Sequence, residues 1–353
     1  MNKLKIGYWP LSKSMNAPGD RRRLVFWARS RGHEIITDLT QKVDVIVASE
    51  NSDFKARVFR EAKVPIVFDL VDALLCSKNP IDDLVRGIAK RVDKQLSSGF
   101  STYTRYVKDF CQLSKIVICS SPEQEKIAQE FNRNTHIILD CHSELPFRDL
   151  SNIDRSPKTN IKKIFWEGQP ATISGIKKIG SELETIVTNN DVELDFITDK
   201  KYFRLLNKYF EADTFDLLAD SLTLGENKVS ITSWSTENLL EGAQRSTFAI
   251  IPIDLSIPLI KFKPENRLLI MWRLGLPCLT SASPAYKRVS KDAGVGAVCE
   301  DSNEWLRKMQ NFIDDPEFAR EEALRGQAYL RDNHTESQIF KKWDAAIESA
   351  LSH

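Results

Sequence analysis

The chain has 353 residues, a length typical of two domains. Hydrophobic residues make up 42% and charged residues 28%, which is typical of a globular protein and excludes a disordered chain. The 50 basic residues almost balance the 49 acidic ones, and this argues against a nucleic-acid-binding protein.

Cysteine usage and the N-terminus both indicate a cytoplasmic protein. The six cysteines are scattered and no two form a Cys-x-x-Cys pair, which favours reduced thiols. Residues 1–9 are too few and too charged for a signal peptide, and no apolar run has membrane-spanning length. We therefore expect a cytoplasmic location and leave open a peripheral contact with the inner face of a membrane.

The chain begins with a strand, a loop and a helix. Residues 5–9 are strand-like, and after a turn residues 21–31 have helical character. Asp20 can cap this helix, and Gly19 can bring the backbone close to a ligand. Arg21 begins a triplet of arginines of which one or two could reach that ligand, the rest being solvated.

Two carboxylates follow a buried parallel strand. The apolar runs 43–48 and 64–68 predict strands, and the second ends in Asp69 and Asp72. Open α/β sheets keep their chemistry at this carboxyl edge, although Asp72 could instead only cap the next segment. Residues 81–94 predict a basic helix, either a solvated face or a patch for an anionic acceptor or lipid headgroups.

The N-terminal series continues with a strand at 116–119 and a helix start at 120–124. His142 lies in a later loop that could reach a cleft, unless it is structural. Residues 149–160 are polar and lack periodicity, which predicts an interdomain linker. We therefore assign 1–150 to the first domain.

The C-terminal half begins a second series of strands and helices. Residues 161–166 predict a strand, and Gly168 and Gln169 lie in the loop after it. A helix is expected over 201–210. Trp234 follows a later strand, where an aromatic side chain could contact a nucleobase or belong to the core.

The strongest site signal is a helix start. Residues 248–253 predict a buried strand, and Lys263 opens a helix with Pro264 at its first position and Gly275 at its C-cap. Unpaired amides and the helix dipole attract anions there, and Lys263 and Arg267 add positive charge, as a diphosphate requires. The alternative is an ordinary βα unit with a solvated basic cap.

The closing segment is an amphipathic helix at 336–353, so we assign 160–335 to the second domain. Two successive βα series predict an α/β protein with two doubly wound, Rossmann-like domains facing across a cleft. The sequence lacks the glycine-rich dinucleotide and P-loop motifs, and it lacks His and Cys spacings for a metal.

Six segments of the C-terminal half carry a family resemblance: 248–252, 263–269, 275–277, 283–286, 302–305 and 315–317. Together they resemble the retaining glycosyltransferases of the GT-B fold, in the family that includes sucrose-synthase-like and lipopolysaccharide-type transferases. The loop 19–21 and the helix start at 120–121 resemble that family more weakly. The chain departs from the family pattern in its charged residues. Two Glu residues usually stand eight apart, and these positions hold Phe262 and Ile270; the usual Arg and Lys fall near Gln169 and Ser174.

The resemblance implies transfer of a sugar from a nucleotide-sugar donor to a hydroxyl, with retention and without metal or cofactor. It implies a glycan or lipid-linked acceptor, no nucleic-acid partner, and a role in bacterial surface polysaccharide or glycoconjugate synthesis. The last helix would pack back on the first domain. Asp72 or Asp69 would receive or orient the acceptor proton. The donor-binding residues would be Gly19, Arg21, Gly168, Gln169, Trp234, Lys263, Glu265, Asn266 and Arg267.

Two other functions fit the same sequence. A sugar-nucleotide epimerase would use several carboxylates and histidines, and Asp69, Asp72 and His142 are available for that. A catalytically inactive nucleotide-sugar-binding protein would explain the missing Glu pair.

Overall fold

A computed structural model describes most of the chain. The described residues are 2–76, 83–84, 88, 101–148, 150, 162–203 and 211–352. The predicted linker, apart from residue 150, and most of the predicted basic helix at 81–94 lie outside them.

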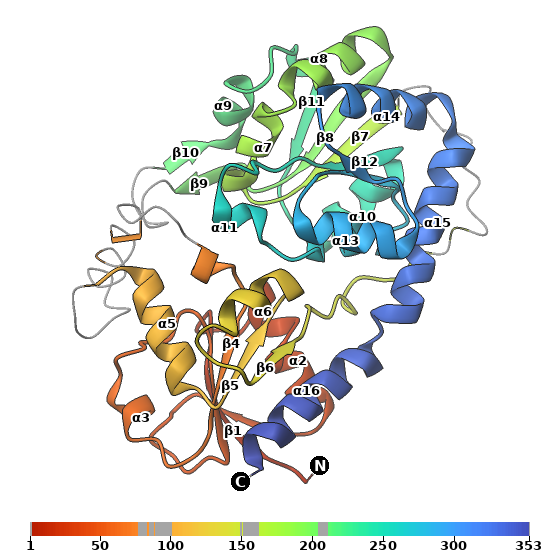
Figure 1. Ribbon diagram of the computed structural model, residues 1–353. Helices are drawn as coiled ribbons and strands as arrows, with labels where there is room; N and C mark the ends of the chain where they lie inside the picture. Colours follow the sequence, from red (N-terminus) through yellow and green to blue (C-terminus); the bar gives the residue numbers. More distant parts are fainter. Residues whose placement is uncertain are drawn as a thin grey trace. The chain divides into compact units, whose positions relative to one another are not determined.

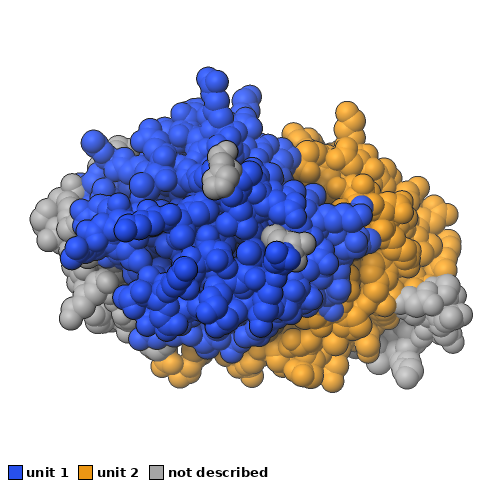
Figure 2. Space-filling model, turned by 90° about the horizontal axis from the view of Figure 1, so that it is seen from below, with its two compact units in different colours: residues 1–143, 258–264, 334–353 blue, residues 144–257, 265–333 orange. Residues whose placement is uncertain are grey.

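The chain forms two compact units (Figure 2). Unit 1 comprises residues 1–143, 258–264 and 334–353, and unit 2 comprises residues 144–257 and 265–333. The short segment 258–264 therefore belongs to unit 1, although it lies within the stretch assigned from sequence to the second domain.

Unit 1 contains a parallel sheet of six strands in the order β2-β1-β3-β4-β5-β6. The strands are β1 (Lys5–Trp9), β2 (Glu34–Ile36), β3 (Val45–Ala48), β4 (Ile66–Leu70), β5 (Ile116–Cys119) and β6 (Thr135–Ile137). The helices are α1 (Pro18–Arg21), α2 (Leu24–Ser30), α3 (Arg57–Arg60), η1 (Leu74–Cys76), α5 (Tyr103–Leu113), α6 (Pro122–Ala128), α11 (Pro258–Lys261) and α16 (Glu336–Leu351). Strands β3, β4 and β5 are buried along their whole length, as their apolar runs predict.

Side-chain alternation gives this sheet two separate cores. Phe68 of β4 packs with α5 on one face, and Val67 packs with α2 and α16 on the other. Figure 1 shows α5 and α16 on opposite sides of the sheet. The indole rings of Trp27 in α2 and Trp343 in α16 stack with centroids 5.7 Å apart, so the last helix of the chain completes the core of unit 1.

Unit 2 contains a second parallel sheet of six strands, in the order β11-β8-β7-β12-β13-β14. The strands are β7 (Lys162–Glu167), β8 (Val192–Ile197), β11 (Val229–Thr232), β12 (Phe248–Ile251), β13 (Cys278–Ser281) and β14 (Val298–Cys299), with a separate antiparallel pair β9 (Lys201–Phe203) and β10 (Glu211–Asp213). The helices are η2 (Pro170–Thr172), α7 (Ser174–Lys177), α8 (Gly180–Asn189), α9 (Thr214–Ala219), η3 (Glu226–Lys228), α10 (Thr236–Arg245), α12 (Asn266–Arg273), α13 (Pro284–Ala293), α14 (Ser302–Asp314) and α15 (Pro316–Asn333).

Helix α12 is fixed by close packing and by its C-terminal turn. Gly275 has φ +73, which confirms the predicted left-handed C-cap. A Cβ atom added at Gly326 of α15 would lie 2.4 Å from Cγ of Trp272, so only glycine lets α15 approach α12 this closely. The C-terminal end of α12 is therefore held closely against α15.

Two predicted helices are wrong at their starts. Residues 201–203 form β9, because they pair with β10, while 204–210 lie outside the described residues. The helix predicted to open at Lys263 begins instead at Asn266, with Glu265 as its N-cap. Residues 262–265 are not helical and separate α12 from α11, whose Leu259 packs on the core of unit 1.

Candidate functional site

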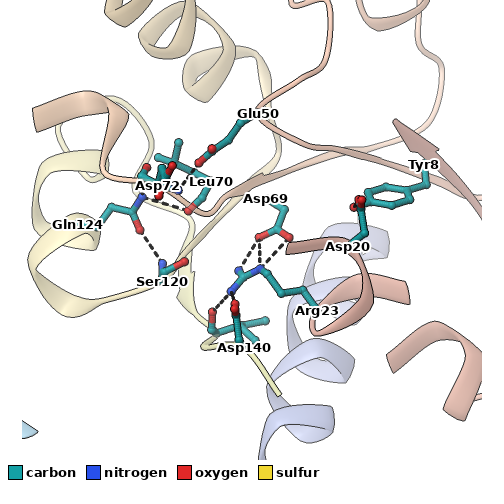
Figure 3. Close-up of polar contacts among 11 residues, drawn as sticks. Tyr8, Asp20, Arg23, Glu50, Asp69, Leu70, Asp72, Ser120, Gln124 and Asp140 are labelled. Carbon is teal, nitrogen blue, oxygen red and sulfur yellow. Dashed lines mark hydrogen bonds and ion pairs between the residues drawn. The ribbon is translucent and has the colours of Figure 1, made fainter. Parts of the chain in front are cut away.

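The loop after β4 holds Asp72 by its backbone. The Asp72 N–H donates to a carboxylate oxygen of Glu50, and the Asp72 carbonyl accepts a hydrogen bond of 2.7 Å from Nε2 of Gln124 (Figure 3). The same Nε2 also donates to the carbonyl of Leu70, at 3.1 Å. The backbone N–H and C=O of Asp72 thus both have hydrogen-bond partners, so its side chain is available for other contacts.

Gln124 reaches this loop because of the way α6 begins. Ser121 caps the helix by accepting from the Gln124 N–H at 3.2 Å, and Pro122 occupies the first turn, as the sequence predicts. The Oε1 atom of Gln124 accepts a 2.6 Å hydrogen bond from the Ser120 N–H. One amide side chain therefore joins the ends of β4 and β5.

The side chain of Asp72 is 41% exposed and its Oδ1 atom lies 3.3 Å from Nζ of Lys263. Lys263 belongs to unit 1 and precedes α12, so the structure brings together two residues predicted for different roles. An ion pair this exposed contributes little to stability. The pair places the Lys263 ammonium beside the carboxylate predicted to act on the acceptor. Lys263 itself lies before α12 and is not part of that helix.

Glu50 is a further carboxylate beside Asp72, and it was not predicted from the sequence. It follows β3, is 9% exposed, and its carbonyl accepts a 2.7 Å hydrogen bond from the Tyr103 hydroxyl. Burial raises the pKa of Glu50 to about 8, and the negative charge of Asp72 adds to this effect. The rule that singled out Asp69 and Asp72, a carboxylate at the end of an apolar run, would have found Glu50 as well.

Asp69 lies in a closed ion-pair network. Its side chain is 2% exposed, and Nη2 of Arg23 lies 2.5 Å from its Oδ1. The Nε atom of Arg23 donates to Oδ2 at 3.0 Å, and its Nη1 donates to Asp140 at 3.2 Å (Figure 3). Burial raises the pKa of Asp69, while Arg23 opposes that rise. Both carboxylate oxygens of Asp69 face Arg23, so the structure does not present Asp69 to an acceptor.

The loop before α1 is organised by hydrogen bonds to Asp20. Its fully buried carboxylate accepts from the Tyr8 hydroxyl at 2.6 Å and from the Leu11 N–H at 2.8 Å. The expected helix cap by Asp20 is wrong, because α1 begins at Pro18 after Ala17. A Cβ atom at Gly19 would lie 2.4 Å from Cδ1 of Leu11, so packing already accounts for this glycine. Arg21 lies in the same short helix, and Arg23 is the member of the triplet that enters the core.

In unit 2, Arg267 lies at the start of α12 and contacts the end of β7. Its Nη2 atom donates to the carbonyl of Glu167, and its guanidinium lies 5.3 Å from the centroid of the Trp166 ring. Its Nε atom is 3.8 Å from the Glu167 carboxylate. The arginine is therefore held at the carboxyl edge of the second sheet, where the sequence predicts an anion site.

Glu167 also fixes Trp234, a link that the sequence analysis missed. The Trp234 indole N–H donates a 3.0 Å hydrogen bond to Oε1 of Glu167. Glu167 is the last residue of β7, and Trp234 follows β11. The structure thus joins Arg267 and Trp234 through one carboxylate.

Glu265 lies at the N-cap of α12 but faces a protein partner. Its carboxylate is 2% exposed and pairs with Arg288, whose Nη1 and Nη2 each lie 3.0 Å from one oxygen. Asn266 begins the helix, and its buried Oδ1 atom has no hydrogen-bond partner among the described residues. Glu265 thus forms an ion pair with Arg288 at the start of α12, and Asn266 has a buried acceptor atom without a partner among the described residues.

The glycine-containing loop after β7 is shaped by packing. A Cβ atom at Gly168 would lie 2.7 Å from Oγ1 of Thr172 and 3.0 Å from the Trp166 ring. Gln169 is exposed, and its carbonyl accepts from the Thr172 N–H at 2.8 Å as η2 begins. Ile270, at one family Glu position, is buried inside α12, so no carboxylate lies there.

His142 is 2% exposed, and its ring centroid lies 5.6 Å from that of His334.

Within the described ranges, no group of three or more His, Cys, Asp or Glu side chains could hold a metal ion. All six cysteines are free and buried. None of the helices in the described part of the chain has both the length and the apolar character needed to cross a membrane.

No family model matches the sequence, and no curated protein sequence matches it. The fold matches solved structures of glycosyltransferases. HepE of Anabaena, crystallised with UDP and glucose, has a TM-score of 0.66 at 13% identity, over 98% of this chain and 100% of HepE. A glycosyltransferase of Rickettsia africae has a TM-score of 0.59 at 13% identity, over 100% of both chains.

TarM has a TM-score of 0.59 at 10% identity, over 86% of this chain and 54% of TarM, so this chain spans about half the length of TarM. Identities this low show the fold alone. The two parallel sheets of six strands, with these structural neighbours, confirm the predicted α/β fold and its resemblance to GT-B glycosyltransferases.

Proposed function

We propose that this chain is a glycosyltransferase that moves a sugar from a nucleotide-sugar donor to a hydroxyl acceptor with retention. One observation carries the proposal: Arg267 lies at the start of α12 and at the carboxyl edge of the second sheet, in a fold matched by enzymes crystallised with nucleotides. HepE was crystallised with UDP-glucose, and TarM of S. aureus with UDP and alpha-GlcNAc-glycerol.

The donor end of the reaction needs stabilisation of negative charge. When the sugar leaves, charge develops on the diphosphate, and preorganised donors lower the barrier most effectively. The first amides of α12 and the guanidinium of Arg267 would supply these donors, so the proposal requires no metal ion or cofactor. Phosphate oxygens would replace the Glu167 carbonyl as the acceptor for Arg267.

Trp234 and Asn266 are the proposed contacts for the rest of the nucleotide. The hydrogen bond to Glu167 fixes the Trp234 ring, and we assign the ring to stacking on the base. The unpartnered Oδ1 atom of Asn266 would accept a hydrogen bond from the donor. Gly168 and Gln169 border the same strand end, and we keep them as backbone contacts.

We propose Asp72, and not Asp69, as the group that receives or orients the proton of the acceptor hydroxyl. Its carboxylate is partly exposed and its backbone is held on both sides, whereas Asp69 is enclosed with Arg23. A positioned carboxylate contributes to such a reaction only when it is within hydrogen-bond reach of the proton. Lys263 would orient the Asp72 carboxylate, and this role replaces the phosphate role expected from the sequence.

The proposed acceptor is a glycan or a lipid-linked sugar, in bacterial surface polysaccharide or glycoconjugate synthesis. The complex of TarM with alpha-GlcNAc-glycerol supports a glycoside as acceptor or product. We place the protein in the cytoplasm, in peripheral contact with the inner face of the membrane, where lipid-linked sugars would be accessible.

Nucleotide release from a panel of nucleotide sugars tests the proposal. We expect release from at least one donor, faster when glycan acceptors are added, and loss of most release in Arg267→Ala. NMR of the product gives the anomeric configuration, and an inverted product would exclude retention. If no nucleotide sugar is consumed under any acceptor condition, the transferase proposal fails.

A second candidate is a nucleotide-sugar-binding protein without transfer activity. The observation that favours it is the buried Ile270 at one family Glu position, with Phe262 at the other. Calorimetry would then give a dissociation constant for a nucleotide sugar that the protein never consumes. Formation of an isomeric nucleotide sugar without acceptor would indicate an epimerase instead.

A further inference from the structure

Glu50 is a buried carboxyl group to which the proposed function gives no role. It leaves β3 at the same sheet edge as Asp72 leaves β4, and it accepts the backbone N–H of Asp72 (Figure 3). The Tyr103 hydroxyl of α5 fixes the backbone of Glu50 from the other side. The position of Asp72 therefore depends directly on where the Glu50 carboxyl lies.

Four charged or titratable groups face Glu50 from the elements around it. Asp72 and Asp69 come from the end of β4 and repel an ionised Glu50, while Lys263 from the segment 258–264 attracts it. Tyr103 comes from α5 and bonds the backbone carbonyl. Burial and the two carboxylates outweigh the single ammonium, and they raise the pKa of Glu50 to about 8. Near pH 7 the Glu50 carboxyl is therefore mostly neutral.

We infer that Glu50 is a positioning residue for Asp72: the neutral Glu50 carboxyl holds the Asp72 backbone and leaves the Lys263 ammonium to pair with the Asp72 side chain. Ionised Glu50 repels Asp72 and competes with it for Lys263, and this draws the acceptor carboxylate out of position. The inference rests on the proposed function, because it concerns the residue that would orient the acceptor.

The first test observes the pair without any activity. Carbon-13 NMR of protein labelled at the Glu side-chain carboxyl gives the titration of Glu50, which is assigned by its absence in Glu50→Gln. We expect the Glu50 resonance to titrate near pH 8 and its midpoint to fall by about one unit or more in Asp72→Asn, since one unit is the size of coupling that a close like charge produces. In the control variant Glu61→Gln, an exposed Glu paired with Arg57, the midpoint stays unchanged. A midpoint that Asp72→Asn does not move overturns the inference.

The second test compares pH profiles of nucleotide release with saturating donor. Wild type and Glu61→Gln should both lose rate as pH rises through the Glu50 titration, and Glu50→Gln should lack this alkaline limb. Glu50→Ala should lower kcat at pH 7 by about 10- to 100-fold, the cost of a misplaced reacting group, with the donor KM hardly changed. Circular dichroism confirms that each variant is folded.

An alkaline limb that persists unchanged in Glu50→Gln also overturns the inference. If wild-type protein consumes no nucleotide sugar, the proposed function fails. The NMR titration then decides by itself whether Glu50 and Asp72 are coupled, so the two failures remain distinguishable.

Discussion

Asp69 lies near the end of β4 and Asp72 lies two residues beyond the strand, yet their surroundings differ completely. Alternation along the strand turns Asp69 toward the α2 side of the sheet, where Arg23 encloses it. Asp72 lies beyond the strand, has a half-exposed side chain and pairs with Lys263. A carboxylate at a sheet edge is thus structural when a buried cation encloses it, as Arg23 encloses Asp69. It remains available for chemistry when its cation is exposed, as Lys263 is.

The largest effect we expect is on stability, from Asp69→Ala. Removing one member of a buried ion pair leaves Arg23 charged inside the core, and this costs about 3–5 kcal/mol. Urea unfolding should show this loss, while Asp72→Ala should change the free energy of unfolding by no more than about 1 kcal/mol, because its ion pair is exposed. Equal losses in the two variants would remove the distinction between the two carboxylates.

In activity the order of the two carboxylates should be reversed, with the larger effect coming from Asp72→Asn. The amide keeps the size of the side chain but cannot take up a proton, so we expect kcat to fall by about 100-fold or more. The donor dissociation constant should stay within about twofold of wild type, because the proposal assigns Asp72 to the acceptor and not to the donor. Retained activity in Asp72→Asn would transfer the acceptor role to another group.

A third comparison concerns the two cations expected from the sequence to bind phosphate. Arg267→Ala should weaken donor binding by about 1–3 kcal/mol, the value of charge-assisted hydrogen bonds. Lys263→Ala should leave donor binding nearly unchanged and lower kcat, because Lys263 pairs with Asp72. Calorimetry with the nucleoside diphosphate and steady-state kinetics separate the two effects. Equal weakening of donor binding by both variants would restore the phosphate role of Lys263.

These contrasts also mark what sequence could predict. Apolar runs such as 43–48 predicted the buried strands, Ser121 with Pro122 predicted a helix start, and Gly275 predicted a C-cap, because each depends on neighbouring residues. The Arg23–Asp69 pair joins residues far apart in sequence, and no local pattern predicts it. The assignment of 258–264 to unit 1 likewise depends on tertiary packing of Leu259.

The sequence pointed to candidate residues at two sheet edges but left out several of the residues that contact them. Strand ends identified Asp72 and a helix near the true start of α12, because carboxyl edges follow from topology alone. Glu167 and Arg288 were not predicted, because their roles come from the residues they contact. Glu167 accepts a hydrogen bond from Trp234, and Arg288 donates one to Glu265. Partners of this kind become visible only when the chain is folded.

The smallest effect we expect is the change that Lys263→Ala makes in how stability depends on pH. The pKa of Glu50 rises from 4.5 unfolded to about 8 folded, so the folded state keeps a proton that the unfolded state loses. Its contribution to stability is therefore full below about pH 4.5 and declines as pH rises to about 8. Lys263 lowers this pKa, so Lys263→Ala should extend the decline to higher pH.

Melting temperatures between pH 5 and pH 9 measure this dependence, with wild type as the reference. Glu50→Gln should flatten the decline, because the amide does not titrate. Lys263→Ala should differ little from wild type at pH 5 and melt lower at pH 9, because the Lys263 ammonium stabilises only the ionised form of the Glu50 carboxyl. If Lys263→Ala melts lower by the same amount at both pH values, the lysine acts on stability independently of Glu50, and Asp72 is then its only partner.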